Sequence, residues 1–294
     1  MAEIVNINGV DIRFEIHGEG IPIVYTSGGF WTLEKGRAVA ERLRPLGYKV
    51  LLWDRPNTGE SGLIFEGEDL LQIWADKLRE LLHYTGLSPA FVSGGSAGGL
   101  ASLYFAYLYP AEVKGLIFIA PPTDDKEIWE NLVGDTFLGS AEMAEKKGMS
   151  AALEAQGGML DLFNWPDQFQ RVPYKKQQLL SLNPQVFAET MRVWARSFMA
   201  GRRSYLAGLS DEQLATINIP TIVFSGAGGF HPQHTAEALH ARLSQSTLVI
   251  SAEYYAETWD QILRDMEAKG DEYFDAALVG RIDEFVQSVL STSK

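Results

Sequence analysis

The chain has 294 residues, of which 46% are hydrophobic and 21% are charged, and its formal net charge is −13. This composition is typical of one large globular core rather than a disordered chain, and the negative charge argues against binding to the phosphate backbone of nucleic acids. There is no Cys, so disulfides, thiolate catalysis and cysteine-based metal sites are excluded.

No targeting signal or membrane span is expected. The N-terminal residues 1–14 reach an alternating apolar and polar pattern at once, without the basic and apolar regions of a signal peptide. No run approaches the roughly 18 apolar residues of a membrane span. Together with the absence of Cys, this favours a protein of the reducing cytoplasm that does not bind membranes.

The first part of the chain alternates predicted strands with predicted helices. The hairpin dipeptide Asn8-Gly9 joins two strands with alternating side chains. Continuous apolar runs then predict buried parallel strands, and apolar residues at helical spacing predict helices between them. In chain order the strands are expected at 21–27, 48–54, 89–93 and 113–120, and the helices at 33–47, 69–86 and 97–110.

The rhythm changes between Pro121 and about Ile217, where the sequence has helical periodicity and no convincing strand. Strand and helix patterns then resume, with strands expected at 220–226 and 246–251 and helices at 232–243 and 273–290. We predict an α/β fold with a doubly wound, mostly parallel sheet. Residues 1–121 and 218–294 would form the sheet domain, and residues 122–217 a helical cap inserted into it.

One short motif predicts chemistry. Gly94 to Gly98 fit the pattern G-x-S-x-G, after an apolar strand and before a helix. A sharp turn there would hold Ser96 in a strained conformation, which requires small neighbours, and would present its hydroxyl above the sheet edge. Ser96 is therefore a candidate nucleophile; a glycine-rich turn without chemistry is the alternative.

Two further loops follow predicted strands. In the first, YTSGGFW, the N–H of Gly29 could join that of Ala97 in an oxyanion hole, and Trp31 could line a substrate pocket. In the second, WDRPNTGESG, Asp54 and Arg55 suit a tight hydrogen-bonded turn, and we expect its role to be structural.

The order of the turn DRPNTGES, the elbow GGSAGG, the helical insertion and the late strands and helices resembles the α/β-hydrolase superfamily over essentially the whole chain. The resemblance implies that Ser96 is the nucleophile, that Gly29 and Ala97 donate to the oxyanion, and that the insertion roofs the site. It also implies a catalytic acid after the penultimate strand and a His after the last one. Here Gly228 stands where the acid is expected, and Tyr255 stands near the place expected for the His.

A relocated base is one interpretation of this departure. His231 precedes Pro232 in the loop that should carry the acid, and it could hydrogen-bond Ser96 as a general base. Glu253 on the last loop, or Asp124 after the strand that follows the elbow, could orient it. His231 could instead line the pocket or cap the loop, and Asp124 could be the N-cap of the first inserted helix.

The other interpretation is loss of hydrolysis. Without a base the Ser hydroxyl is a poor nucleophile, but the pocket could still bind a small molecule or serve a lyase or cyclase, with Tyr254 or Tyr255 lining the site or donating a proton. A metal site is not indicated, because the pair His231 and His234 has no evident further ligands, and His234 is expected to face outward.

We therefore predict a cofactor-independent hydrolase of a small, mostly apolar ester, lactone or related carbonyl compound, with an atypical catalytic triad. The alternative is a degenerate member of the fold that binds a small molecule or acts as a lyase or cyclase. The substrate prediction depends on the aromatic and Met side chains of the insertion, which suit an apolar pocket roof and equally the core of a helical cap. Neither nucleic acid nor a membrane is expected as a partner, and the sequence does not indicate an oligomeric state.

Overall fold

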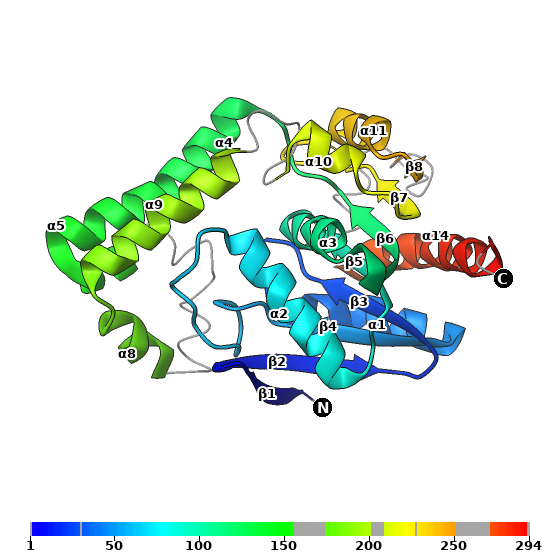
Figure 1. Cartoon of the computed structure of the whole chain (residues 1–294), viewed down its shortest axis with the longest axis horizontal. Coiled ribbons are helices and arrows are strands. Elements are labelled where there is room, and N and C mark those ends of the chain that lie inside the picture. The colour runs from blue at the N-terminus through cyan, green and yellow to red at the C-terminus, as the bar shows by residue number, and fades with distance from the viewer. Residues whose placement is uncertain are drawn as a thin grey trace.

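The computed structural model describes six stretches of the chain, namely residues 2–29, 31–155, 174–200, 209–226, 228–250 and 271–292. Within these stretches lies one sheet of eight strands in the order β1-β2-β4-β3-β5-β6-β7-β8 (Figure 1). Its antiparallel pairs are β1–β2 and β2–β4, and the other strand pairs are parallel. The prediction of a doubly wound, mostly parallel sheet is confirmed.

The strands lie at the predicted apolar and alternating runs, with ends that differ by up to a few residues. They are β1 (Glu3–Ile7), β2 (Val10–His17), β3 (Ile21–Thr26), β4 (Tyr48–Trp53), β5 (Ala90–Gly95), β6 (Val113–Ile119), β7 (Thr221–Phe224) and β8 (Ser246–Val249). Asn8, in the turn between β1 and β2, has a φ of 48°, as a tight hairpin turn requires.

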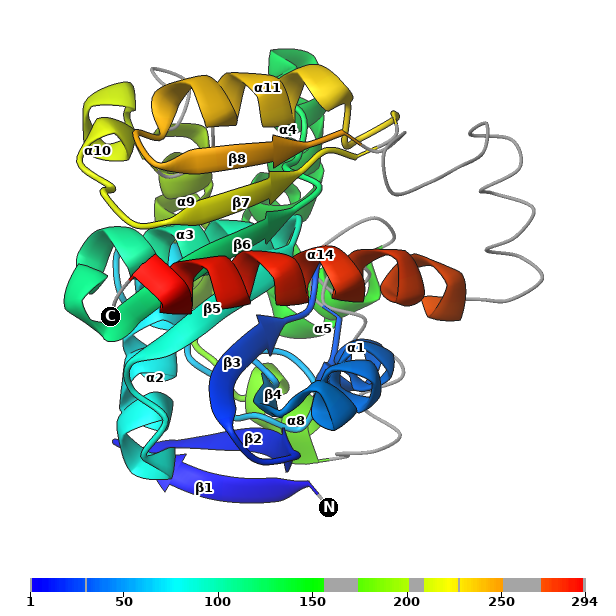
Figure 2. The ribbon, with the colours of Figure 1, turned by 90° about the vertical axis from the view of Figure 1, so that its right-hand side faces the viewer.

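Helices cover both faces of the sheet (Figure 2). They are α1 (Arg37–Leu43), α2 (Leu70–Thr85), α3 (Ala97–Leu108), α11 (Gln233–Arg242) and α14 (Asp271–Thr292). Successive strand residues alternate between the faces: Leu51 belongs to the core under α2, α3 and α11, and Leu52 to the core under α1 and α14. Burial on both faces explains why these strands are apolar throughout.

The helices between β6 and β7 form an arm beside the sheet (Figure 1). They are α4 (Lys126–Val133), the π-helix η4 (Gly134–Leu138), α5 (Gly139–Glu154), α8 (Tyr174–Leu180) and α9 (Pro184–Ala200). The last helix of this segment, α10 (Asp211–Ala215), lies beside α11 instead. The part of 122–217 that the structure describes contains no strand, as predicted. The division into a sheet domain and a cap stays a prediction.

The loop after β4 attaches α9 to the sheet domain. The Phe65 ring stacks on Trp194 with a centroid distance of 5.8 Å, and its carbonyl accepts a hydrogen bond from Thr190 Oγ1 at 3.2 Å. Trp194 and Phe198 are both buried: Trp194 packs against this loop, and Phe198 packs inside the arm against Trp129 and Phe137. No helix among the described residues is long and apolar enough to cross a lipid bilayer.

Candidate active site

Ser96 stands at a sharp turn between β5 and α3. Its backbone has φ 50° and ψ −118°, a conformation that a non-glycine residue adopts only at a cost. A Cβ on Gly98 would lie 2.1 Å from the carbonyl oxygen of Thr26, so the helix can approach β3 only if this residue is glycine. The predicted strand–turn–helix context of the elbow is confirmed.

The loop after β3 lies directly beside this turn. A Cβ on Gly28 would be 3.0 Å from the carbonyl oxygen of Gly95 and 3.6 Å from Ser96 Cβ. Ala97 is the first residue of α3, so its N–H has no acceptor within the helix. The joint role of the Gly29 and Ala97 N–H groups as an oxyanion hole stays a prediction.

His231 reaches Ser96 from the loop after β7. The distance between His231 Nε2 and Ser96 Oγ is 2.9 Å, which is the contact that the relocated-base hypothesis requires. Gly228 and His231 exchange two backbone hydrogen bonds of 3.1 and 3.2 Å across a tight turn, and the Phe230 carbonyl accepts from Thr123 N at 2.7 Å. The backbone thus holds the imidazole at the elbow.

Burial alone lowers the pKa of His231 from its ordinary value of 6.5. The rings of His231 and Phe230 are nearly perpendicular, with an interplanar angle of 84° and a centroid distance of 5.3 Å. No carboxylate among the described residues hydrogen-bonds His231. A lowered pKa keeps the imidazole neutral at pH 7, the state in which it can accept a proton from Ser96.

The structure corrects the prediction for Asp124. Asp124 Oδ1 lies 2.9 Å from Nε2 of His234, and both side chains are exposed. It is therefore paired with the outward-facing histidine rather than with His231. It is also not the N-cap of α4, because Asp125 accepts the hydrogen bond from the N–H of Ile128.

The pair His231 and His234 does not converge on a common point. His231, in the loop before α11, contacts Ser96, and His234, in the first turn of α11, contacts Asp124. Within the described stretches, no group of three or more His, Asp or Glu side chains is arranged to hold a metal ion.

The remaining predicted site residues are only partly described. Glu253, Tyr254 and Tyr255 lie outside the described residues. Trp31 is 55% exposed, with Lys35 Nζ 5.4 Å from its ring centroid, so its role in lining a pocket stays a prediction.

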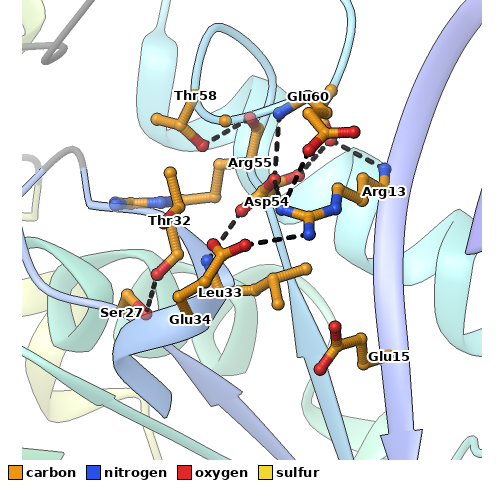
Figure 3. A network of polar contacts seen from close by, with 12 residues as sticks. Arg13, Glu15, Ser27, Thr32, Leu33, Glu34, Asp54, Arg55, Thr58 and Glu60 are labelled. Carbon is orange, nitrogen blue, oxygen red and sulfur yellow. Dashed lines mark hydrogen bonds and ion pairs between the residues drawn. The ribbon is translucent and has the colours of Figure 1, made fainter. Parts of the chain in front are cut away.

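The turn DRPNTGES is the centre of a buried polar network (Figure 3). Asp54, which is fully buried, accepts hydrogen bonds from Leu33 N at 2.7 Å, Glu60 N at 3.0 Å and Arg13 Nη1 at 3.2 Å. Burial raises the pKa of Asp54, and these three donors oppose that change. The predicted structural role of this turn agrees with these contacts.

Two members of this network were not found from the sequence. Arg13 on β2 donates to Glu34 Oε1 at 2.8 Å. Burial acts to raise the pKa of Glu34, but hydrogen bonds from Arg13 and Thr32 outweigh it and lower that pKa to about 2. Only a weak indication of this network is present in the sequence. Arg13 is a charged residue between two apolar strand residues, and that pattern does not identify the groups that pair with it.

A mostly parallel eight-stranded sheet with helices on both faces, and a Ser on a strained turn between a central strand and a helix, define the α/β-hydrolase class. The model of the family described as "Serine aminopeptidase, S33" matches residues 22–267, and the chain belongs to this family of α/β-hydrolases.

Similar proteins include several hydrolases. The chain is 31% identical over 114 residues to "Putative carbamate hydrolase RutD" of Azorhizobium caulinodans, a match that covers 37% of this chain and 40% of that protein. It is 28% identical over 249 residues to "Bifunctional esterase/perhydrolase DCH" of Acinetobacter calcoaceticus, covering 77% and 81%.

A solved structure with a similar fold is the enol-lactonase from Burkholderia xenovorans LB400. Its TM-score is 0.61 at 16% identity, over 97% of this chain and 100% of that chain. At this identity the likeness concerns the fold.

Proposed function

We propose that this protein is a serine hydrolase of small esters or lactones, with Ser96 as the nucleophile and His231 as the general base. The observation that carries the proposal is the 2.9 Å contact between His231 Nε2 and Ser96 Oγ at the elbow. This distance is within the range for proton transfer between a base and a nucleophile, and such roles are defined by geometry rather than by position in the chain.

The reaction would proceed in two halves. His231 Nε2 accepts the hydroxyl proton as Ser96 Oγ bonds to the carbonyl carbon, and the N–H groups of Gly29 and Ala97 bind the oxyanion. The tetrahedral intermediate expels the alkoxide, which takes the proton from His231, and leaves an acyl group on Ser96. Water, activated by His231, then releases the acid and restores the serine.

An orienting carboxylate would complete a triad. Asp124 is engaged by His234, so we assign this part of the proposal to Glu253. The expected consequence is that Glu253→Gln lowers kcat and leaves KM nearly unchanged, because it affects the tautomer and orientation of His231 rather than substrate contacts.

The proposed substrate class rests on two supports. Two relatives in sequence are described as a carbamate hydrolase and as an esterase/perhydrolase. The ring of Phe230 beside His231 and the indole of Trp129, 5.7 Å from Phe230, provide apolar surface next to the dyad. We therefore expect an uncharged substrate.

The test is labelling with a fluorophosphonate probe at pH 7.5, followed by gel fluorescence. The wild type should be labelled, Ser96→Ala should not, and His231→Ala should react about 10²- to 10⁴-fold more slowly. His234→Ala is the matched control: it removes an imidazole three residues away that pairs with Asp124, and its labelling rate should equal that of the wild type.

Two results would contradict the proposal. An unlabelled wild type that also fails to hydrolyse p-nitrophenyl acetate would leave the alternative of a small-molecule binder, lyase or cyclase. Full labelling of His231→Ala would assign the base to another residue.

A further inference from the structure

Arg55 and Asp54 hold two ends of the loop that follows β3. Arg55 Nη2 donates to the carbonyl oxygen of Gly29 at 2.5 Å, and Asp54 Oδ1 accepts from the N–H of Leu33 at 2.7 Å. Within the same loop, Ser27 Oγ donates to the carbonyl oxygen of Thr32 at 2.9 Å. The loop is therefore attached to the end of β4 by a cation and an anion from adjacent residues.

Burying the charged side chain of Arg55 costs free energy. It is 1% exposed, and burial lowers the pKa of its guanidinium, opposed by the Asp54 carboxylate. Its guanidinium carbon lies 4.4 Å from the ring centroid of Trp74, which supplies a cation–π contact. Figure 3 shows the Arg55 side chain pointing away from that of Arg13, so the two arginines serve different parts of the network.

The contact with Gly29 controls the direction of peptide planes. The N–H of Gly29 and the carbonyl of Gly28 belong to the same planar trans peptide, so they point in opposite directions. That Gly28 carbonyl accepts from Trp31 N at 3.1 Å, and Arg55 holds the next carbonyl, that of Gly29. Gly29 has a φ of 48°, a conformation that these two contacts stabilise from both sides.

We propose that Arg55 is a positioning residue for the oxyanion hole. By holding the Gly29 carbonyl it fixes the backbone conformation of Gly29, and together with the Trp31 N–H on the Gly28 carbonyl this directs the Gly29 N–H toward Ser96. This inference rests on the proposed function, because it assigns a role within the same site. Arg55 does not touch the substrate; it acts through the loop. Gly28 lies against Gly95 and Ser96, which keeps the loop after β3 close to the nucleophile.

The test compares Arg55→Met with Arg79→Met. Methionine keeps an apolar side chain against Trp74 and removes the donor. Arg79 is the matched control, since its guanidinium also lies over an aromatic ring, 4.7 Å from Tyr109, and its Nε donates to Glu112, in contacts that do not involve the loop. Three quantities are measured: kcat and KM for p-nitrophenyl acetate, the inhibition constant of phenylboronic acid, and amide hydrogen exchange of residues 27–36.

In Arg55→Met, kcat should fall and the inhibition constant of phenylboronic acid should rise, each by about 10- to 1,000-fold, because the boronate adduct of Ser96 carries the negative charge that the oxyanion hole binds. KM should change less than threefold. Hydrogen exchange of 27–36 should be about tenfold faster, while the melting temperature stays near that of the wild type, since replacing a buried charge by an apolar side chain is often neutral. Arg79→Met should leave the kinetics and the exchange unchanged.

Unchanged exchange and unchanged boronate inhibition in Arg55→Met would overturn the proposal. Global unfolding of Arg55→Met would also count against it, because it would show a role in the whole fold, unless Arg55→Lys folds and reproduces the faster loop exchange and weaker boronate binding. Failure of the proposed function is visible separately, as a wild type that neither turns over ester nor binds boronate.

Discussion

At the scale of single residues, the site combines a strained serine with a half-buried histidine whose pKa is lowered by burial. Ser96 has a positive φ and Oγ directed at His231 Nε2, 2.9 Å away. The two side chains come from positions 135 residues apart in the chain. In contrast, His234, three residues further on, is exposed and belongs to an Asp124 pair on the surface.

The first residue-scale prediction concerns pH. Because burial lowers the pKa of His231, kcat/KM should fall toward acid pH with a midpoint below 6.5, as protonation removes the proposed base. A lowered pKa means that the native state favours the neutral imidazole. Protonation at acid pH should therefore lower both the activity and the free energy of unfolding. A pH–rate profile with p-nitrophenyl acetate measures this limb. His234→Ala should have the same profile, whereas a limb above pH 6.5 would contradict the assignment.

At the scale of elements, the loop between β7 and α11 holds the His231 side chain against Ser96. A Cβ on Gly226 would lie 2.2 Å from the carbonyl oxygen of His231 and 2.4 Å from its Cβ. The first inserted helix, α4, packs Trp129 against Phe230, and Trp129 Nε1 donates to the Thr123 carbonyl at 2.5 Å. The position of His231 therefore depends on α4 as well as on its own loop.

The prediction at this scale is that Gly226→Ala displaces His231 and lowers kcat about 100-fold, because a shift of about 1 Å in a catalytic group has an effect of that size. Ser96 is untouched, so KM should change little. Gly134→Ala is the control, since a Cβ there meets nothing within 4 Å and alanine favours a helix. Steady-state kinetics of the two variants decide the matter; equal activities would show that the loop adjusts around the added methyl group.

At the scale of the whole molecule, the arm is attached to the sheet domain by a buried lysine as well as by apolar contacts. Lys175 on α8 is fully buried and its Nζ donates to the carbonyl oxygen of Gly59 at 2.5 Å. Burial lowers the pKa of Lys175 to about 8, while Asp54 and Glu60 oppose that change. The same turn that contacts the loop after β3 thus also receives a side chain from the arm.

This contact predicts a linkage between stability and pH. The ordinary pKa of Lys175 is 10.5, so between pH 8 and 10.5 the unfolded chain binds more protons than the native one, and the free energy of unfolding rises with pH. The contribution is on the order of 3 kcal/mol, since one pKa unit corresponds to about 1.4 kcal/mol. In Lys175→Met this rise should be absent. The difference in melting temperature, wild type minus Lys175→Met, should therefore increase between pH 8 and 10.5. The exposed neighbour Lys176 provides the control Lys176→Met; a pH-independent difference for Lys175→Met would contradict the linkage.

Local sequence determined the sheet, the helices and the elbow, because apolar periodicity and small residues at a turn reflect burial and backbone sterics that act over a few residues. With only five His in the chain, it also made His231 the main candidate for a base, and it left open that His231 only lines the pocket. Only the tertiary structure decided that His231 contacts Ser96 and that Asp124 pairs with His234 rather than with His231. It likewise revealed Arg13 beside Asp54 and Lys175 beside Gly59. Such pairs join residues far apart in the chain, and nothing in a local pattern specifies which distant polar group will satisfy a buried charge.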